Sequence, residues 1–196
     1  MNENTYTSHV NSAIKNIEKL PSREQIKDKI SLFSSYDRVV FCTMGKSAFA
    51  CRKIVHTARS YGLQWYDLDV CHAFHGDAGI IKRGDLLVLV SKSGETEETV
   101  KVSKYFSNWE KIAVCSDVQS TLSKTCNNRI IIPIETEGSP FGYAPMISTV
   151  MYSLVLHGIL TEVIESKGCK IEEYARNHPS GKIGEMIKND PSLTRK

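Results

Sequence analysis

Short apolar runs rich in β-branched residues alternate with stretches of helical spacing along the middle of the chain. Four of these runs are almost continuously apolar, and a fifth is less so. Continuous apolar runs are typical of strands that are covered on both faces of a sheet. Strands that alternate with helices predict βαβ units and a parallel, doubly wound sheet. The predicted strands are Val39–Cys42, Gln64–Val70, Asp85–Val90, Ile112–Cys115 and Ile130–Ile134.

Two helices are predicted before the first strand. Apolar residues recur at three- and four-residue intervals from Val10 to Leu20, and Pro21 ends this helix. Ser22 opens the second helix, whose apolar face carries Ile26, Ile30 and Phe33. The helices predicted between the strands are Ala48–Tyr61, Thr96–Phe106 and Ser120–Cys126.

A long apolar helix and a short tail are predicted after the last strand. The helix runs from Ala144 to about Ser166, and Gly168 closes it. Its wide apolar face indicates burial against the sheet or partly at a subunit interface. In the tail, a short helix and a further helical turn are separated by a break at His178-Pro179.

Length and composition favour one α/β domain, since single domains usually have about 100–200 residues and the chain has 196. We expect N-terminal helices over about 5–34, a three-layer core over about 38–168 and a helical tail over about 170–190. The net charge, 25 basic minus 22 acidic residues, is +3, which does not suggest a nucleic-acid partner.

Location follows from three further features of the sequence. No apolar run approaches the about 18 residues of a spanning helix, and the N-terminus lacks the pattern of a signal peptide. We therefore expect a cytoplasmic protein without a membrane partner. Six scattered cysteines without a C-x-x-C pair fit buried, reduced thiols better than disulfides or a zinc site.

The two most polar turns, residues 43–47 and 91–96, follow the first and third predicted strands. With the strand order 2-1-3-4-5 these strands are neighbours at the switch point of the sheet, where ligands bind in such folds. Each turn opens a helix, whose free N–H groups and dipole favour an anion. The sequence therefore predicts a phosphate site lined by Ser47, Ser91, Ser93 and Thr96, with Lys46 and Lys92 adding charge.

Two alternatives apply to these turns. Gly45-Lys46-Ser47 resembles the end of a P-loop, but that motif needs a glycine where this sequence has Val40, which disfavours a nucleoside triphosphatase. Hydroxyl residues before a helix also serve simply as N-caps. For one turn alone this second alternative stays open, whereas two such turns at one switch point favour a ligand.

The order of several motifs resembles that of sugar isomerase (SIS) domains. The S-x-S-G-E-T turn is shared by many relatives, whereas its combination with the two histidine motifs is more specific and resembles arabinose-5-phosphate isomerases over about residues 5–188. The motifs are Gly45-Lys46-Ser47, Ser91–Thr96, His75-Gly76-Asp77, Ala144-Pro145 with Ser148-Thr149, and Ala175–Gly181.

The resemblance implies an aldose–ketose isomerase that interconverts D-ribulose 5-phosphate and D-arabinose 5-phosphate and supplies the precursor of Kdo, an acid of lipopolysaccharide or capsule. It implies no metal or cofactor, and a homo-oligomer, with a tetramer favoured, whose tail reaches a neighbouring site. Ser47, Ser91, Ser93 and Thr96 match the phosphate ligands. Lys46, Glu98, Glu137 and His178 match the functional lysine, glutamates and histidine, and His75 matches a second active-site histidine.

This reaction moves a proton between C1 and C2 through an enediolate, and it needs a carboxylate base and an electrophile near the oxygens. We expect Glu137 or Glu98 to be the base, Lys46 to stabilise the enediolate, and His178 to open the sugar ring. Each residue also has a simpler interpretation. Glu98 fits the dipole of a helix start, and Glu137 and His178 fit a solvated loop and an ordinary surface.

The chain also departs from the family pattern, with Thr43 and Ala48 flanking the first turn, Ser180 after His-Pro, and Met146-Ile147 at the entrance of the long helix.

His72, His75 and Asp77 have spacing that could suggest a metal, and we interpret them as pocket-lining. We expect no regulatory CBS modules in 196 residues. The alternatives are isomerisation of another sugar phosphate and a non-catalytic sugar-phosphate-binding regulator, although no helix-turn-helix extension is evident.

Overall fold

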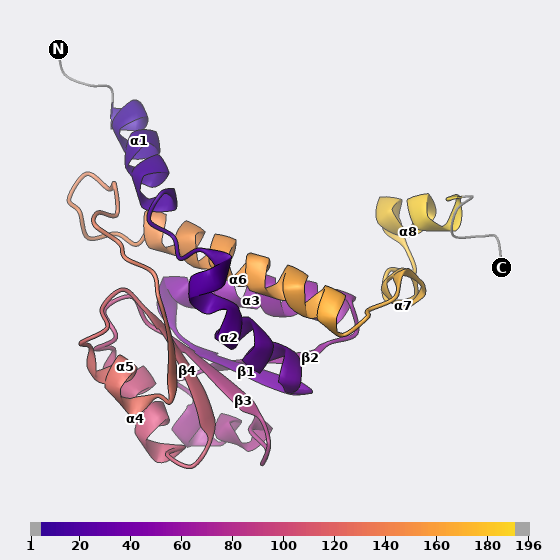
Figure 1. The fold of residues 1–196 in the computed structure, drawn as a ribbon, viewed down its shortest axis with the longest axis horizontal. Coiled ribbons are helices and arrows are strands. Elements are labelled where there is room, and N and C mark those ends of the chain that lie inside the picture. Colours follow the sequence, from indigo (N-terminus) through magenta and orange to yellow (C-terminus); the bar gives the residue numbers. More distant parts are fainter. Residues whose placement is uncertain (1–4, 191–196) are drawn as a thin grey trace.

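Five parallel strands form one sheet in the order β2-β1-β3-β4-β5 in the computed structural model, which describes residues 5–190 (Figure 1). The predicted order 2-1-3-4-5 is therefore confirmed. Most of the predicted strands differ by one or two residues at their ends. β5 ends earlier than expected, although Ile132 beyond it is still buried and donates its N–H to Cys115 O. The strands are β1 Arg38–Thr43, β2 Gln64–Asp69, β3 Leu86–Val90, β4 Glu110–Cys115 and β5 Asn128–Ile131.

Each predicted helix is present, and two short 3-10 helices that the pattern did not predict follow β2. α6 begins at Ile147, three residues after the predicted start. The helices are α1 Thr5–Ile17, α2 Arg23–Ser35, α3 Gly45–Ser60, α4 Glu97–Tyr105, α5 Thr121–Thr125, α6 Ile147–Ser166, α7 Ile171–Arg176 and α8 Gly181–Lys188, with the 3-10 helices η1 Ala73–His75 and η2 Asp77–Ile80.

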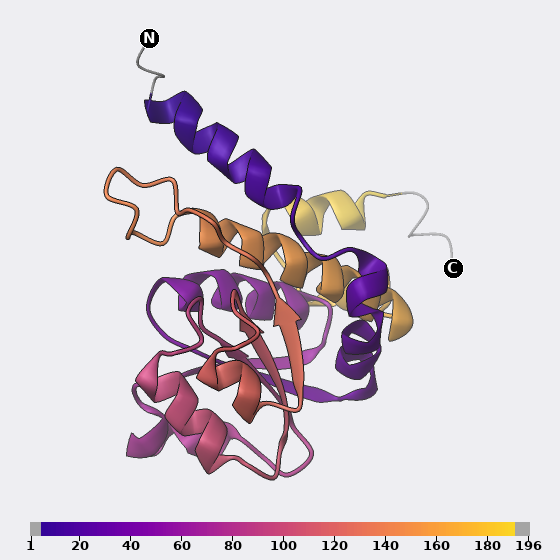
Figure 2. The same ribbon diagram turned by 60° about the vertical axis from the view of Figure 1, so that its left-hand side comes forward.

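The helices cover both faces of the sheet, as a doubly wound fold requires (Figure 2). Alternate residues of a strand point to opposite faces. Val39 and Phe41 of β1 therefore pack with α2, α3 and α6, whereas Val40 and Cys42 pack with α4 and α5. The result is a three-layer molecule with two separate apolar cores.

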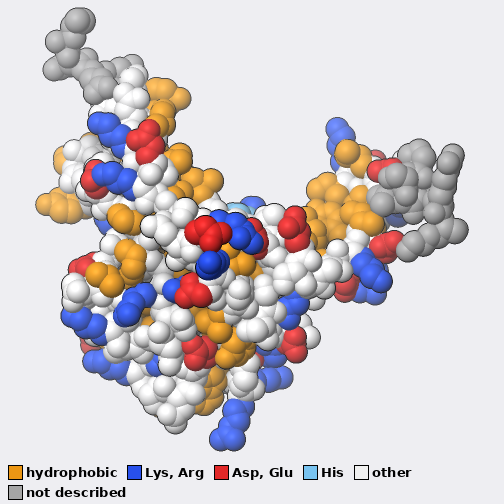
Figure 3. Space-filling view, in the orientation of Figure 1, with side chains coloured by type: hydrophobic (Ala, Val, Ile, Leu, Met, Phe, Trp, Pro, Cys, Tyr) orange, Lys and Arg blue, Asp and Glu red, His pale blue; other side chains and the backbone are white. Residues whose placement is uncertain are grey.

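α1 and α2 differ in how they use their apolar residues. In α2, Ile26, Ile30 and Phe33 are buried as predicted, and Gln25 accepts the N–H of Ser22 at the helix start, 2.8 Å away. In α1, three residues of the predicted apolar stripe, Val10, Ile14 and Ile17, are 36–49% exposed. Apolar side chains gather along α1 in the space-filling view (Figure 3). Ala13 and Leu20 of the same stripe pack against the core, so α1 is covered in part by the described residues of its own chain.

α6 is the longest helix and packs against α1, α2 and α3. By length and composition it is apolar enough to cross a membrane, with a mean hydropathy of 1.6 over the window. The prediction that no segment is long and apolar enough to cross a membrane is therefore wrong. Half of the window is buried inside the protein, as in a core helix, and it includes Met151, Val155 and Ile159. Val150 and Leu154 on the outer face stay about half exposed.

The cysteine prediction is confirmed in its main point, because all six thiols are free. Four of them are buried, whereas Cys169 is half-buried and Cys71 is exposed. Burial raises the pKa of the Cys51 thiol to about 12. The buried thiols therefore act as small apolar groups of the two cores.

Candidate active site

The carboxyl ends of β1 and β3 lie side by side, since the two strands pair directly from Val39↔Leu86 to Cys42↔Leu89. α3 and α4 begin just beyond these ends. Neither helix has a side-chain cap from the residues that the structure describes. The first N–H groups of both helices are thus available at one place, which is the arrangement that favours a bound anion.

The turn between β3 and α4 is held in shape by its own hydroxyl groups. Ser91 Oγ lies 2.7 Å from Thr96 Oγ1 and accepts the N–H of Gly94 at 3.2 Å. Ser93 Oγ accepts the N–H of Glu95 at 3.1 Å. Gly94 has a φ of +68°, which an L side chain rarely adopts. The turn is therefore organised before any ligand arrives.

The turn between β1 and α3 offers a cation beside this site. Lys46 lies in the first turn of α3 and is exposed, and Ser47 is half-buried. Lys46 lines a groove of about 380 Å³ between α3 and the start of α6, together with Phe49, Pro145 and Thr149. A ligand at the switch point could therefore meet an ammonium group at the edge of an open groove.

Glu98 and His75 also lie on the carboxyl edge of the sheet. Glu98 is exposed in the first turn of α4, and His75 is exposed in η1, which follows β2. Desolvation, Asp69 and the charge of Glu98 together raise the pKa of Cys71, which follows β2. No group of three His, Cys, Asp or Glu side chains within residues 5–190 is arranged to hold a metal ion.

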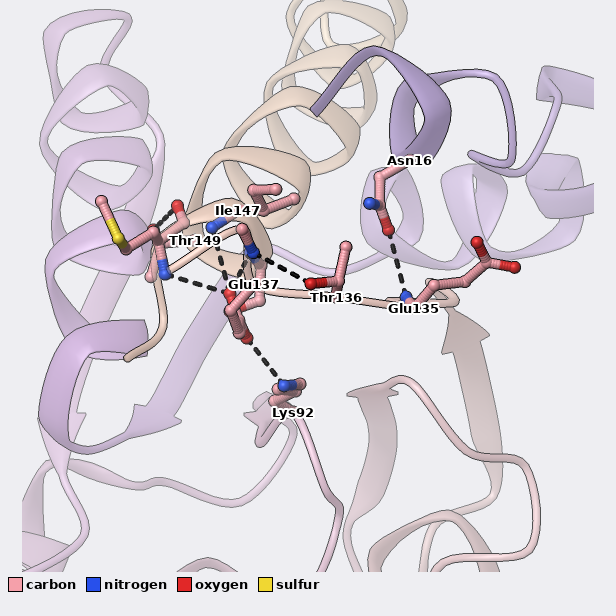
Figure 4. A network of polar contacts seen from close by, with 10 residues as sticks. Asn16, Lys92, Glu135, Thr136, Glu137, Ile147 and Thr149 are labelled. Atoms are coloured by element: carbon pink, nitrogen blue, oxygen red, sulfur yellow. Dashed lines mark hydrogen bonds and ion pairs between the residues drawn. The ribbon is translucent and has the colours of Figure 1, made fainter. Parts of the chain in front are cut away.

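Glu137 is not a solvated loop residue, because its side chain is completely buried. Its Oε2 accepts the N–H groups of Met146, Ile147 and Ser148, each at 3.0 Å, at the start of α6. Its Oε1 lies 2.8 Å from Lys92 Nζ. Figure 4 shows these contacts converging on the carboxylate from two sides.

The electrostatics of this carboxylate follow from its partners. Burial by itself would raise the pKa of Glu137, but Lys92 and the Ser148 N–H outweigh it, and the pKa is lowered. Lys92 was expected to add charge at the phosphate site; its ammonium is paired with Glu137, and its side chain is 40% exposed. The sequence held no signal for this pair, because it joins two turns that lie far apart in the chain.

The loop that carries Glu137 is also fastened to α1. Asn16 is buried, and its Oδ1 accepts the N–H of Glu135 at 3.3 Å (Figure 4). His9 Nδ1 lies 2.9 Å from Gly138 O. The first helix therefore supports the loop between β5 and α6, which the amphipathic pattern of α1 did not predict.

His178 lies far from the other predicted residues of its own chain. Asn177 donates to Ser60 O at 3.1 Å, so the tail sits at the end of α3. Lys46 at the start of α3 is about 21 Å away along the helix axis at 1.5 Å per residue. His178 Nδ1 contacts Tyr174 O at 2.9 Å, and its ring stacks on Tyr174 with centroids 4.2 Å apart. In Figure 1 α7 and α8 project away from the body.

The structure thus gathers most of the predicted residues on one edge and leaves one apart. The hydroxyl groups, Lys46, Glu98, His75 and Glu137 come from the turns that follow β1, β2, β3 and β5. Only His178 among the predicted site residues belongs to the distant tail. Within one chain the site is therefore open on the side of the groove.

Fold and site together define a domain of the sugar isomerase class. The model of the SIS domain family matches residues 32–161, and the chain belongs to that family. A curated relative, the arabinose 5-phosphate isomerase KpsF of Escherichia coli O6:H1, is 30% identical over 179 residues. The match covers 90% of this chain and 55% of the relative. The chain therefore spans about half the length of the curated relatives it matches.

Solved structures agree on the fold. The protein c3406 of E. coli CFT073, in complex with arabinose 5-phosphate, has a TM-score of 0.83 at 24% identity, covering 89% of this chain and 95% of that one. A phosphosugar isomerase described as involved in capsule formation, from Bacteroides fragilis, has a TM-score of 0.81 at 22% identity, covering 89% and 95%. Both comparisons extend the likeness beyond the residues of the family model.

Proposed function

We propose that this protein is a metal-independent aldose–ketose isomerase that interconverts D-ribulose 5-phosphate and D-arabinose 5-phosphate. The observation that carries the proposal is the meeting of two uncapped helix starts with Lys46 and Glu98 at the switch point. The two helix starts suit a bound phosphate, and Lys46 and Glu98 suit proton transfer next to a carbonyl. The similarity to KpsF supports the same substrates.

Phosphate binding falls to the two turns. Ser47, Ser91, Ser93 and Thr96 surround the free N–H groups of α3 and α4, and these dipole ends favour a dianion. The sugar then extends from the phosphate along the carboxyl edge of the sheet. This places its first two carbons within the range of side chains from α3 and α4.

Proton transfer needs a carboxylate that can both accept and return a proton. Glu98 takes a proton from C1 of the ketose, a second proton moves from O1 to O2 of the enediolate, and Glu98 returns its proton to C2 to give the aldose. Lys46 stabilises the negative charge on the oxygens of C1 and C2. His75 lines the pocket beyond β2. Glu98 is accessible, whereas both oxygens of Glu137 are engaged.

His178 acts from a neighbouring subunit. Arabinose 5-phosphate closes into a ring, and a histidine that gives a proton to the ring oxygen opens it. Because His178 lies at the far end of its own α3, we propose that the tail enters the open groove beside Lys46 of a second copy. The protein is therefore a homo-oligomer, with a tetramer favoured, whose active sites are shared.

The test is a direct assay of the purified protein with D-ribulose 5-phosphate, followed by a panel of other ketose phosphates. We expect arabinose 5-phosphate as the product, with the highest kcat/KM among the panel. Preference for a hexulose 6-phosphate would move the assignment to another sugar phosphate. Binding of arabinose 5-phosphate without turnover at high enzyme concentration would instead indicate a sugar-phosphate-binding regulator. A role in supplying Kdo requires, in addition, that loss of the protein is compensated by added arabinose 5-phosphate in cells that make this acid.

A further inference from the structure

The buried carboxylate of Glu137 has all its contacts with protein groups. Three N–H groups at the start of α6 share Oε2, and Lys92 Nζ lies against Oε1 (Figure 4). A general base must exchange a proton with the substrate, and it works best with a pKa near the working pH. The contacts of Glu137 stabilise the charged form and leave no oxygen exposed. Glu137 is therefore badly placed to be the base of the reaction.

Lys92 is the group that Glu137 can act through. It belongs to the turn that holds Ser91, Ser93 and Thr96, and its side chain is 40% exposed. Its carbonyl accepts the N–H of Ser116 at 2.9 Å, which fixes the backbone to the end of β4. The side chain is fixed at its tip by Glu137. A lysine ammonium has three N–H donors, so one contact with Oε1 leaves donors for a second anion.

The surroundings of the pair make this orientation robust. The loop of Glu137 is held to α1 by Asn16 and to α6 by three N–H groups. Glu137 Oε1 is buried and has no hydrogen-bond partner among the described residues, so the ion pair with Lys92 is what balances its charge, and removing Lys92 would leave it uncompensated. The carboxylate and the ammonium therefore hold each other in one position, and the ammonium is the partner that reaches solvent.

We propose that Glu137 is a positioning residue that holds the ammonium of Lys92 beside the phosphate turn, where Lys92 binds the phosphate of the substrate. This inference rests on the proposed function for the identity of the ligand. It assigns Lys92 as a phosphate ligand and removes Glu137 from the proton-transfer step. The ion pair of Glu137 and Lys92 has no net charge. It therefore holds an ammonium group in a fixed position, and the carboxylate offsets the repulsion between this ammonium and the positive ends of the helix dipoles.

The experiment compares Glu137→Gln, Lys92→Met, Lys92→Arg and the double variant Glu137→Gln/Lys92→Met with the wild-type protein. Lys104→Met removes an exposed lysine at the opposite end of α4 and is the matched control. Binding of inorganic phosphate and of arabinose 5-phosphate is measured by calorimetry, and kcat and KM are measured separately. Circular dichroism and melting temperatures establish that each variant is folded.

The expected result is a loss of binding without an equal loss of turnover. Lys92→Met and Glu137→Gln should each weaken phosphate binding by about tenfold or more, as a charge-assisted hydrogen bond predicts, with kcat within about tenfold of the wild type. The double variant should be no weaker than either single variant, because both remove the same interaction. Lys92→Arg should recover most of the affinity, and Lys104→Met should change nothing.

Two results would overturn the inference. One is a Glu137→Gln variant that binds phosphate normally and loses kcat by a factor of about a thousand, as expected for a missing base. The other is full additivity of the two single variants. If Glu137→Gln does not fold, the half-exposed Lys92 variants decide alone through KM and phosphate affinity. A wild-type protein that binds both ligands but does not isomerise would refute the proposed function while leaving the pair testable by binding.

Discussion

Replacing Gly94 by alanine would place a methyl group where the structure has no room for one. Gly94 has a φ of +68°, and a Cβ built there would overlap Cβ and Oγ of Ser120 and lie 3.6 Å from Cys115 Cβ. The left-handed conformation costs an L residue about 1–2 kcal/mol. Overpacking of a rigid contact adds about 1–3 kcal/mol. We therefore expect Gly94→Ala to lower the free energy of unfolding by about 2–5 kcal/mol.

Gly84→Ala separates the two contributions. Gly84 has a φ of +89° but no atom within 4 Å of a built Cβ, so this control should cost only the about 1–2 kcal/mol of backbone strain. Urea denaturation of both variants measures the difference, and adding Ser120→Gly to Gly94→Ala should recover part of the loss. Equal stability of the Gly94→Ala and Gly84→Ala variants would refute the assigned contact with Ser120.

The remaining predictions concern the charged residues of the site. Lys46→Met should lower kcat by a factor of about 10²–10³ without a change in melting temperature, because Lys46 is exposed; normal turnover would remove Lys46 from the reaction. The lowered pKa of Glu137 stabilises the folded state above the ordinary value of 4.5, and this contribution is lost as the pH falls through the lowered pKa. Denaturation from about pH 6 down to pH 3 should therefore show a gap between wild type and Glu137→Gln that narrows in acid; a constant gap would contradict this. Mixing His178→Ala with Lys46→Ala subunits should restore some activity, and complete inactivity of verified mixed oligomers would argue against shared sites.

The strands and their order could be predicted because burial on both faces leaves a direct trace in the sequence. Val39 to Cys42 is continuously apolar since alternate side chains enter different cores. The polar turn at Ser91 similarly marks the end of β3. The end of β5 could not be predicted as well, because Ile132 is buried without belonging to the strand. An apolar residue indicates that its position is buried, whereas the backbone hydrogen bonds determine whether that position belongs to the strand.

The two polar turns could be located from the sequence, whereas the burial of Glu137 and its pairing with Lys92 could not. A hydroxyl turn before a helix is a local pattern, and its chemistry follows from the helix start. The contact between Glu137 and Lys92 depends on how two distant loops pack. His178 shows the same limit, since its motif is local and its distance from Lys46 is set by the length of α3. Local sequence patterns identify candidate side chains, whereas the contacts between these side chains depend on how the chain folds.

The two helix starts at the switch point belong to opposite layers of the molecule. α3 packs with the core of α2 and α6, and α4 packs with the core on the other face of the sheet. Among the residues that the structure describes, the two cores have no buried side chain in common, and the sheet lies between them. A ligand that touches both turns would therefore connect the two helix layers across the edge of the sheet. Its binding should make the two halves unfold as one unit, which hydrogen exchange in each core would reveal.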